Sequence, residues 1–508
     1  MPPRKKIKTK ELCASIDYKK IYRYIDEQKV FCLVCEKDVA TGSGHEKQRL
    51  DELRNSFRHK ELVSKRTTVQ PSIESAVERI DHSKDFNYKL TKAFIAAGIP
   101  LSKVNDQSIK NLFEVDCVIR IYDRSHLTSK YIPLIFEVLI GDIRKSIGNS
   151  FVYFIIDESP DIMHRSVVNV LVGKLDGHYS KPHLLKVDMF DCSVDNTIVS
   201  QVIINACIRL WPEGIKYQDV LFIISDAAAY MKKAYRDNWK TLFPNSIHIT
   251  CLAHAIHNLC DTIRLRYNLV NSFVAKAKER ITASIVNRNA LIEAVGFLPP
   301  KAVITRWGTF LEAAEYYLEF FDQVKDWIES MDSESQATST LKQLIDDPDF
   351  KLQLLSIKNC FFLVQAIKEI EKQGLSVNHQ LSIINDIKNN PILPQWAKDR
   401  FNSILEQNEG IFQLKTRLDS LDDLNYNNRV EYVPLVSADV ERSFSQYKYI
   451  LNDRRTNLGE ENIEKINMLM FNKFIGRQST TSSSNTPTPS TSQAMSASIQ
   501  EIDLSDDE

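Results

Sequence analysis

Two short segments of the chain are apolar along almost their whole length and then end at an aspartate. One is "FVYFII" at 151–156, followed by Asp157, and the other is "VLFIIS" at 220–225, followed by Asp226. Runs of this kind, rich in β-branched and aromatic residues, are typical of strands in the interior of a sheet. The chain is therefore expected to contain a buried sheet in which two strands each end at a carboxylate.

Length, charge and cysteine content narrow the class of protein. At roughly 100–200 residues per domain, 508 residues suggest several domains. The net charge of −1 conceals a basic start, "MPPRKKIKTK", and an acidic end, "EIDLSDDE". Nine cysteines, no apolar leader and no long uncharged apolar stretch argue against secretion and membrane spanning. The sequence predicts reduced thiols in the nucleus or cytosol, and the basic start could import the chain or contact DNA phosphates.

Changes in periodicity divide the chain into segments and predict an α/β or α+β fold. Three consecutive β-type runs after residue 150 are followed by strands that alternate with helices, which is typical of a layered sheet protein. The expected segments are a basic arm at 1–27, a finger at 28–66, a helical connector at 67–149, the first part of the core at 150–265, a helical insertion at 266–425, the completion of the core at 426–474 and a disordered Ser/Thr-rich tail at 475–508.

The two aspartates have a structural explanation and a functional one. Asp157 precedes Ser159-Pro160, a good turn pair, and Asp226 precedes three alanines, where it could cap a helix. Alternatively, two interior strands that end in Asp place both carboxylates on one rim of the sheet, where a hard divalent cation binds. Neither aspartate alone decides between these explanations.

Further motifs follow the two strands in a fixed order. They are "ITCLAHAIHNLC", "ITRWGTFLEAAEYY" and, at 434–474, "PLVSADVERSFSQYKYILNDRRTNLGEENIEKINMLMFNKF". The last segment resembles the C-terminal dimerisation region of the hAT superfamily of DNA transposases. "IIDES" and "ISDAAAYM" are similar to the segments that carry this family's first and second aspartates, and the resemblance covers roughly 150–474.

The resemblance implies an RNase-H-like mixed sheet that is interrupted by a long helical insertion. Asp157, Asp226 and Glu441 would be its three metal-binding and catalytic carboxylates, although Glu441 by position alone is an ordinary helix-surface acid. With Mg²⁺ or Mn²⁺, such a triad supports cleavage of DNA and joining of the freed 3′ hydroxyl to a target. The family comparison also implies double-stranded DNA as partner, a homodimer or higher oligomer, a nuclear location and no membrane.

Several other residues acquire expected roles only through the resemblance. Cys251 and His254 are similar to an element that supports the active site and contacts DNA. Arg306 and Trp307 would contact phosphate and stack on a base, and Arg442 would contact DNA.

The N-terminal finger resembles the BED type and the finger of CGG-repeat-binding proteins. Cys32, Cys35 and His59 match its zinc ligands, but Leu53 stands where a histidine is expected. Because a closed zinc site needs four ligands, His45 would have to supply the fourth, or the site has decayed. Zinc in the finger is therefore an open alternative.

Two other functions compete with transposition. The chain could be a domesticated DNA-binding transcriptional regulator that keeps the scaffold but no longer cuts. It could also be a zinc hydrolase built on Cys251, His254, His257 and Cys260. On one helix, residues spaced by three drift around the axis and cannot all meet one tetrahedral ion, which disfavours the hydrolase.

Overall fold

The structure is a computed structural model, and its chain divides into two compact units, at 1–89 with 110–121 and at 90–109 with 122–508. It describes residues 9–60 and 73–473, except for 16–17, 19–20, 36, 43–45, 118, 303–307, 332–334, 421–423 and 452–457. The expected basic arm lies partly, and the expected tail at 475–508 wholly, outside the described residues.

The N-terminal finger is a small three-stranded sheet with a helix on each side of it in sequence. Strands β1 (Tyr22–Asp26), β2 (Lys29–Cys32) and β3 (Lys37–Ala40) are antiparallel and lie in that order. Helix α1 (Thr9–Ala14) precedes them and α2 (Glu46–Asn55) follows. The buried core comprises Leu12, Cys13, Tyr18, Tyr22, Val30, Cys32 and Leu50. Elements of the finger thus begin at Thr9, within the segment predicted to be an arm.

Helices occupy the segment predicted to be a helical connector. They are α4 (Ile73–Ala96), α5 (Gln107–Asn111), α6 (Arg124–His126) and α7 (Ile132–Ile147), with shorter 3₁₀ and π turns between them. Helix α7 buries an apolar side at three- and four-residue spacing and ends at Gly148, whose φ of 59° suits glycine.

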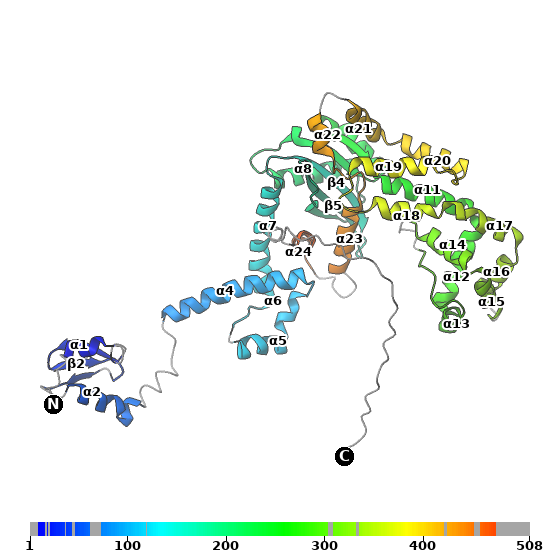
Figure 1. Cartoon of the computed structure of the whole chain (residues 1–508). Coiled ribbons are helices and arrows are strands. Elements are labelled where there is room, and N and C mark those ends of the chain that lie inside the picture. The colour runs from blue at the N-terminus through cyan, green and yellow to red at the C-terminus, as the bar shows by residue number, and fades with distance from the viewer. Residues whose placement is uncertain are drawn as a thin grey trace, which may run out of the picture. The chain divides into compact units, whose positions relative to one another are not determined.

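A five-stranded mixed sheet forms the centre of the second unit (Figure 1). Its strands are β4 (Phe151–Pro160), β5 (Ser166–Leu175), β6 (His183–Phe190), β7 (Val220–Ser225) and β8 (Ile247–Thr250). The order across the sheet is β6-β5-β4-β7-β8, with β5 and β6 antiparallel to their neighbours and β7 and β8 parallel to theirs. The α/β prediction is confirmed, with β4 in the middle of the sheet.

Helices cover both faces of this sheet. Trp211, which ends α8 (Asn196–Leu210), packs edge-on against Phe154 with ring centroids 6.5 Å apart. On the opposite face α23 (Ala438–Ile450) contacts β4 and β5. Because successive side chains of a strand point to opposite faces, a strand covered on both sides must be apolar throughout. This explains why β7 is buried at every position.

Short helices link the parallel strands, and a long helical segment follows them (Figure 1). The linking helices are α9 (Ala229–Ala234) and α10 (Lys240–Leu242). After β8 come α11 (Leu252–Arg266), α12 (Asn268–Ala283), α13 (Ile285–Val295), α14 (Thr309–Glu319), α15 (Phe321–Glu329), α16 (Gln336–Ile345), α17 (Pro348–Ile357), α18 (Phe362–Ile370), α19 (Val377–Asn389), α20 (Gln395–Glu406), α21 (Glu409–Asp419) and α22 (Leu424–Val430). Ser284, Ser335, Asp347 and Ser376 cap four of these helices.

One helical stretch in this segment, Pro348–Ile370, is long and apolar enough to cross a membrane by length and composition. In the structure it is not one helix, because a 3₁₀ turn at Lys358–Cys360 separates α17 from α18. Both helices bury apolar side chains against other helices of the insertion. They therefore resemble the core helices of a bundle.

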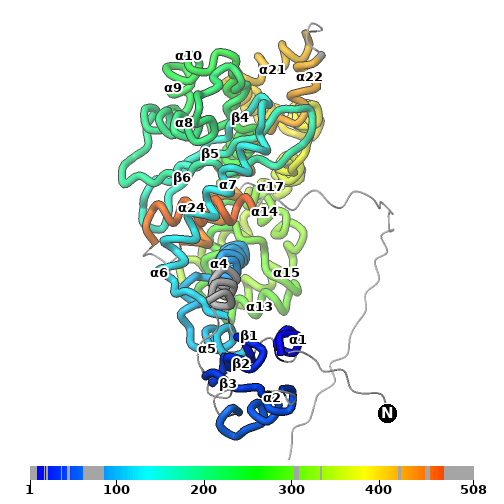
Figure 2. Tube along the Cα trace, turned by 90° about the vertical axis from the view of Figure 1, so that its left-hand side faces the viewer, coloured from blue at the N-terminus to red at the C-terminus, as the bar shows by residue number. Residues whose placement is uncertain are grey.

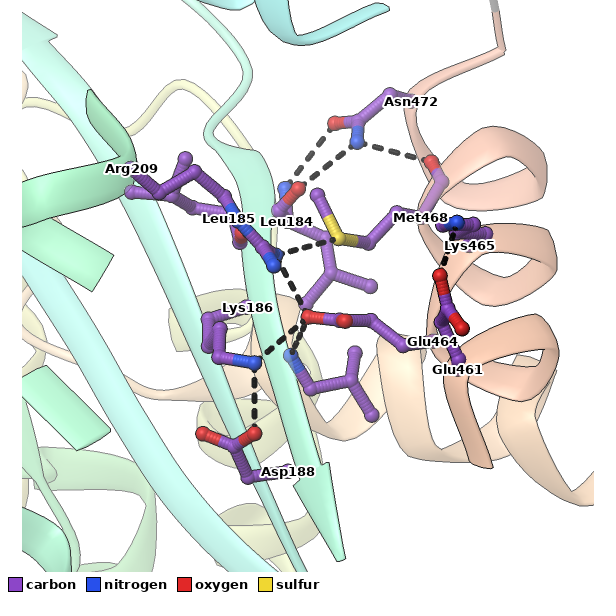
Figure 3. Close-up of polar contacts among 11 residues, drawn as sticks. Leu184, Leu185, Lys186, Asp188, Arg209, Glu461, Glu464, Lys465, Met468 and Asn472 are labelled. Atoms are coloured by element: carbon purple, nitrogen blue, oxygen red, sulfur yellow. Dashed lines mark hydrogen bonds and ion pairs between the residues drawn. The ribbon is translucent and has the colours of Figure 1, made fainter. Parts of the chain in front are cut away.

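The last helix, α24 (Glu460–Asn472), lies along the edge strand β6 and beside α7 (Figure 2). Its side chains bind the backbone that a sheet edge leaves unpaired (Figure 3). Asn472 accepts from the Leu184 N–H at 3.0 Å and donates to the Leu184 carbonyl at 2.9 Å. The helix therefore closes the open edge of the sheet within its own chain.

Candidate metal centre

Asp157 and Asp226 lie on neighbouring parallel strands. In the β4–β7 ladder Ile155 pairs with Ile224, and continuing this register by two residues sets Asp157 beside Asp226. Asp157 is 4 % exposed, and Asp226 follows the last residue of β7. The two carboxylates thus share one rim of the sheet.

The structure does not support a capping role for Asp226. Helix α9 begins at Ala229, and its N-cap, Ala228, offers no side-chain hydrogen bond. The Oδ1 atom of Asp226 accepts from the Ala228 N–H at 3.2 Å, before the helix begins. Burial raises the pKa of Asp226, although the Ala228 N–H, His254 and Lys232 oppose the shift.

Strand β4 includes Ser159 and Pro160, the pair with turn chemistry, and the turn follows the strand at 161–164. The turn acid is Asp161, which accepts from the Arg165 guanidinium at 2.8 and 3.0 Å and from the Tyr447 hydroxyl at 3.1 Å. Burial opposes ionisation, but these hydrogen bonds and the Arg165 charge hold the pKa of Asp161 below its usual range. Asp161 is therefore a structural acid, unlike Asp157.

Long-range contacts bring Glu441 to this rim. The segment before α23 is fastened to the start of α11, because the Leu252 N–H donates to the Leu435 carbonyl at 2.9 Å. The Ser437 N–H also contacts the Cys251 sulfur at 3.2 Å. Glu441 follows in the first turn of α23 and remains exposed.

Asp157, His254 and Glu441 form a compact group of ligand atoms. One atom from each lies within 4.8 Å of the other two. Of the predicted triad, the structure thus brings Asp157 and Glu441 together, with His254 as the third member. Asp226 is outside this group, although its carboxylate is close enough to raise the pKa of Asp157.

Charge in this group is partly offset by a buried Cys251–His254 pair. Burial alone would lower the pKa of His254, but its hydrogen-bonded partner Cys251 and the two aspartates raise it to about 10. Burial would likewise raise the pKa of Cys251, yet His254 and Ser437 lower it. His254 is therefore favoured in its protonated form, whose charge partly offsets the nearby carboxylates.

Asp157 is the least satisfied acid of the site. Its Oδ1 accepts from the Glu158 N–H at 2.9 Å, whereas its Oδ2 is buried and has no hydrogen-bond partner among the described residues. Burial, assisted by Asp226 and Glu441 and opposed by His254, raises the pKa of Asp157 well above its usual range. An unpartnered carboxylate oxygen beside a second carboxylate fits a divalent cation.

Asp157→Asn should stabilise the metal-free protein at neutral pH, whereas Asp161→Asn should destabilise it. The folded pKa of Asp157 lies above the unfolded value of about 3.9, so stability falls as the pH rises through this interval. For Asp161 the folded pKa is lowered, so its contribution is present above the unfolded pKa and is lost on acidification.

Thermal denaturation in EDTA at pH 7 checks the expected effects of these two substitutions on stability. We expect a gain of about 0.5–2 kcal/mol for Asp157→Asn and a loss of about 1.5–3 kcal/mol for Asp161→Asn. Equal losses in both variants would show that Asp157 is as well satisfied as Asp161.

The row of Cys and His residues on α11 does not converge on one point. Cys251 contacts the Ser437 N–H, His254 joins Asp157, and His257 Nε2 lies 3.4 Å from Asp261. Neither metal-ligand group found in the described part of the chain contains His257 or Cys260. This agrees with the argument from helical spacing.

The predicted DNA-contacting residues have different outcomes. Arg442 donates to Asp439 at 2.7 Å and to the Glu371 carbonyl at 2.8 Å, which ties α23 to the end of α18. Arg306 and Trp307 lie outside the described residues.

A second group of ligand atoms lies in the finger. The Nδ1 atom of His59 is 3.8 Å from the Cys32 sulfur and 3.2 Å from the Cys35 sulfur. Two thiols and an imidazole are ligands that zinc prefers. Leu53 packs against the finger core, and His45 lies outside the described residues.

Zinc should bind the finger through these three side chains. We expect Cys35→Ser to weaken zinc binding at least about tenfold, because a serine hydroxyl is a much weaker zinc ligand than a cysteine thiolate. Competition with a chromophoric chelator measures the affinity, with Cys117→Ser, at an exposed cysteine, as the control. Equal affinity in the two variants would remove Cys35 from the site, and His45→Ala tests the fourth ligand.

A scan against models of protein families finds no match for this chain. A search of curated proteins likewise finds no relative. The resemblance therefore remains an interpretation of the motifs, and the geometry must support any proposal about function.

Proposed function

We propose that this chain is a hAT-type DNA transposase, or a protein derived from one, that cleaves and joins DNA strands with Asp157, Asp226 and Glu441. Its mixed sheet would be an RNase-H-like core interrupted by the helical insertion. Double-stranded DNA would be the substrate, Mg²⁺ or Mn²⁺ the cofactor and the nucleus the place of action.

The observation that carries this proposal is the approach of Glu441 to Asp157. The helical insertion separates these residues in sequence, and yet their ligand atoms lie within 4.8 Å of each other. An exposed acid of the first helical turn has no packing reason to meet a buried carboxylate whose Oδ2 has no partner among the described residues. The strand order, antiparallel on one side of β4 and parallel on the other, also agrees with an RNase-H-like core.

Asp157, Glu441 and His254 would each contribute something different to the site. Asp157 would hold a cation from inside the sheet, and Glu441 would hold it from the solvent side, where DNA can approach. A divalent cation bound there would activate the attacking oxygen and stabilise charge on the phosphate. His254 carries positive charge into the site, which offsets the carboxylates before a cation binds.

A supercoiled plasmid assay tests the function directly. With Mn²⁺ or Mg²⁺ the purified chain should produce nicked and joined DNA, and with EDTA it should produce neither. Binding of DNA without cleavage under every condition would instead assign the chain to the regulator class. Dimerisation through 434–474 stays a prediction, and a dimer would have to use the exposed sides of α23 and α24, because their apolar sides are buried within the chain.

A further inference from the structure

Asn169 is a buried polar residue in an otherwise apolar part of β5. It is fully buried, and its neighbours from Val167 to Val172 are all apolar. In the antiparallel ladder it pairs directly with Asp157 of β4. Paired residues of antiparallel strands point to the same face with Cβ atoms about 4.5–5.5 Å apart. The side chain of Asn169 therefore lies beside that of Asp157.

Hydrogen bonding fixes the orientation of the Asn169 amide. The Ser443 hydroxyl donates its only hydrogen to the Val440 carbonyl at 2.6 Å. It must therefore accept from the Asn169 Nδ2, which is 2.7 Å away. The amide nitrogen thus binds the helix that carries Glu441, and the Oδ1 atom has no partner among the described residues.

Oδ2 of Asp157 and Oδ1 of Asn169, which have no hydrogen-bond partner among the described residues, thus belong to two residues that are paired across the sheet. Buried acceptors are nearly always hydrogen-bonded. While Asp157 is ionised, the two oxygens are both acceptors and cannot satisfy each other, whereas a cation can satisfy both. Carboxylate and amide oxygens are the ligands that hard divalent cations take.

We propose that Asn169 is a further ligand of the cation at this site, bound through its Oδ1 atom next to Asp157 Oδ2. This inference rests on the metal centre of the proposed function and adds a neutral ligand to its carboxylates. Through Nδ2 the same residue holds Ser443 of α23, so one side chain would join the ligand from the sheet to the ligand from the helix.

Mn²⁺ binding to the full chain, measured by electron paramagnetic resonance, separates the role of Asn169 as a ligand from its role in holding Ser443 of α23. Asn169→Leu removes the oxygen at similar size and should weaken Mn²⁺ affinity about 10–100-fold. Asn169→Asp keeps an oxygen at that position and should retain the affinity. Ser443→Ala keeps Oδ1 but removes the bond to α23, so we expect it to weaken Mn²⁺ binding less than Asn169→Leu does.

Melting temperatures in EDTA show whether each variant is still folded. Asn169→Leu should melt close to the native temperature, because removal of an unsatisfied buried oxygen offsets the lost Nδ2–Ser443 hydrogen bond and leucine fills a similar space. Unchanged Mn²⁺ affinity in Asn169→Leu would overturn the inference. An equal loss in Ser443→Ala would also overturn it, since Asn169 would then act only by positioning α23.

These outcomes differ from failure of the proposed function. If the native chain bound no Mn²⁺, or if Asp157→Asn bound it as tightly as the native chain, the metal centre itself would be wrong. This inference would then be wrong as well. If the native chain bound Mn²⁺ and cut DNA while Asn169→Leu did the same with equal affinity, only the ligand role of Asn169 would be wrong.

Discussion

Glu441→Gln is expected to lower Mn²⁺-dependent nicking of plasmid DNA by about 10³-fold or more, while DNA binding stays unchanged. The substitution keeps the shape of the side chain and removes the charge that would hold a cation opposite Asp157. Glu441 is exposed in the first turn of α23, so its loss should not disturb packing. The defect should therefore appear in the chemical step.

An exposed acid on the next helix provides the matched control. Glu461 is 77 % exposed at its side chain and forms an ion pair with Lys465, so Glu461→Gln should cut DNA at the native rate. Full activity of Glu441→Gln would exclude the carboxylate triad even if the native chain cleaves DNA. A parallel loss of DNA binding would instead indicate a defect in folding or docking.

The sheet could be predicted from the sequence because its signal is local. A strand covered on both faces must be apolar at successive positions, and "FVYFII" and "VLFIIS" show this directly. Asp157 and Asp226 could be predicted to share a rim for the same reason, since each directly follows such an apolar run, although β4 itself continues past Asp157 to Pro160. The pairing of β4 with β7 then brings the two together.

The rest of the site depends on contacts that leave no local pattern. Glu441 reaches Asp157 because Leu435 and Ser437 bind the start of α11, and nothing in "ADVERSFS" reveals this without the family resemblance. The exact end of β4 was mispredicted because Ser159-Pro160 has turn chemistry, whereas the ladder with β5 keeps the strand extended.

Asn169 was missed although a signal was available. A single amide within "SVVNVLVGKL" is unusual for a buried strand, because an amide there needs hydrogen-bond partners that apolar neighbours cannot give. Such a residue deserves the same scrutiny as an acid at the end of a strand. Its partner Ser443 is contributed by a distant helix, which sequence spacing does not disclose.

Removal of the Glu464 carboxylate is expected to lower the free energy of unfolding more than Asp161→Asn does. Glu464, on α24, is 8 % exposed and accepts from Lys186 at 3.0 Å and from Arg209 at 2.6 Å (Figure 3). The same Glu464 oxygen lies 3.4 Å from the Val187 N–H of the edge strand. Glu464→Ala would leave two partly buried cations without this partner, a change that costs about 3–5 kcal/mol.

Acid should weaken the contacts of Glu464 with Lys186 and Arg209, and hydrogen exchange at the edge strand β6 measures this effect. Burial opposes ionisation, but Arg209 and Lys186 lower the pKa of Glu464, so its stabilisation is present above the unfolded pKa of about 4.3 and is lost as the pH falls. Hydrogen exchange should therefore quicken at the Leu184 and Val187 amides in Glu464→Ala at pH 7 and in the native chain in acid. Because an uncovered edge strand pairs with other chains, the variant should also aggregate on warming. Glu461→Ala should change unfolding free energy by less than about 0.5 kcal/mol, and a similarly small effect in Glu464→Ala would mean that apolar packing alone holds α24 on β6.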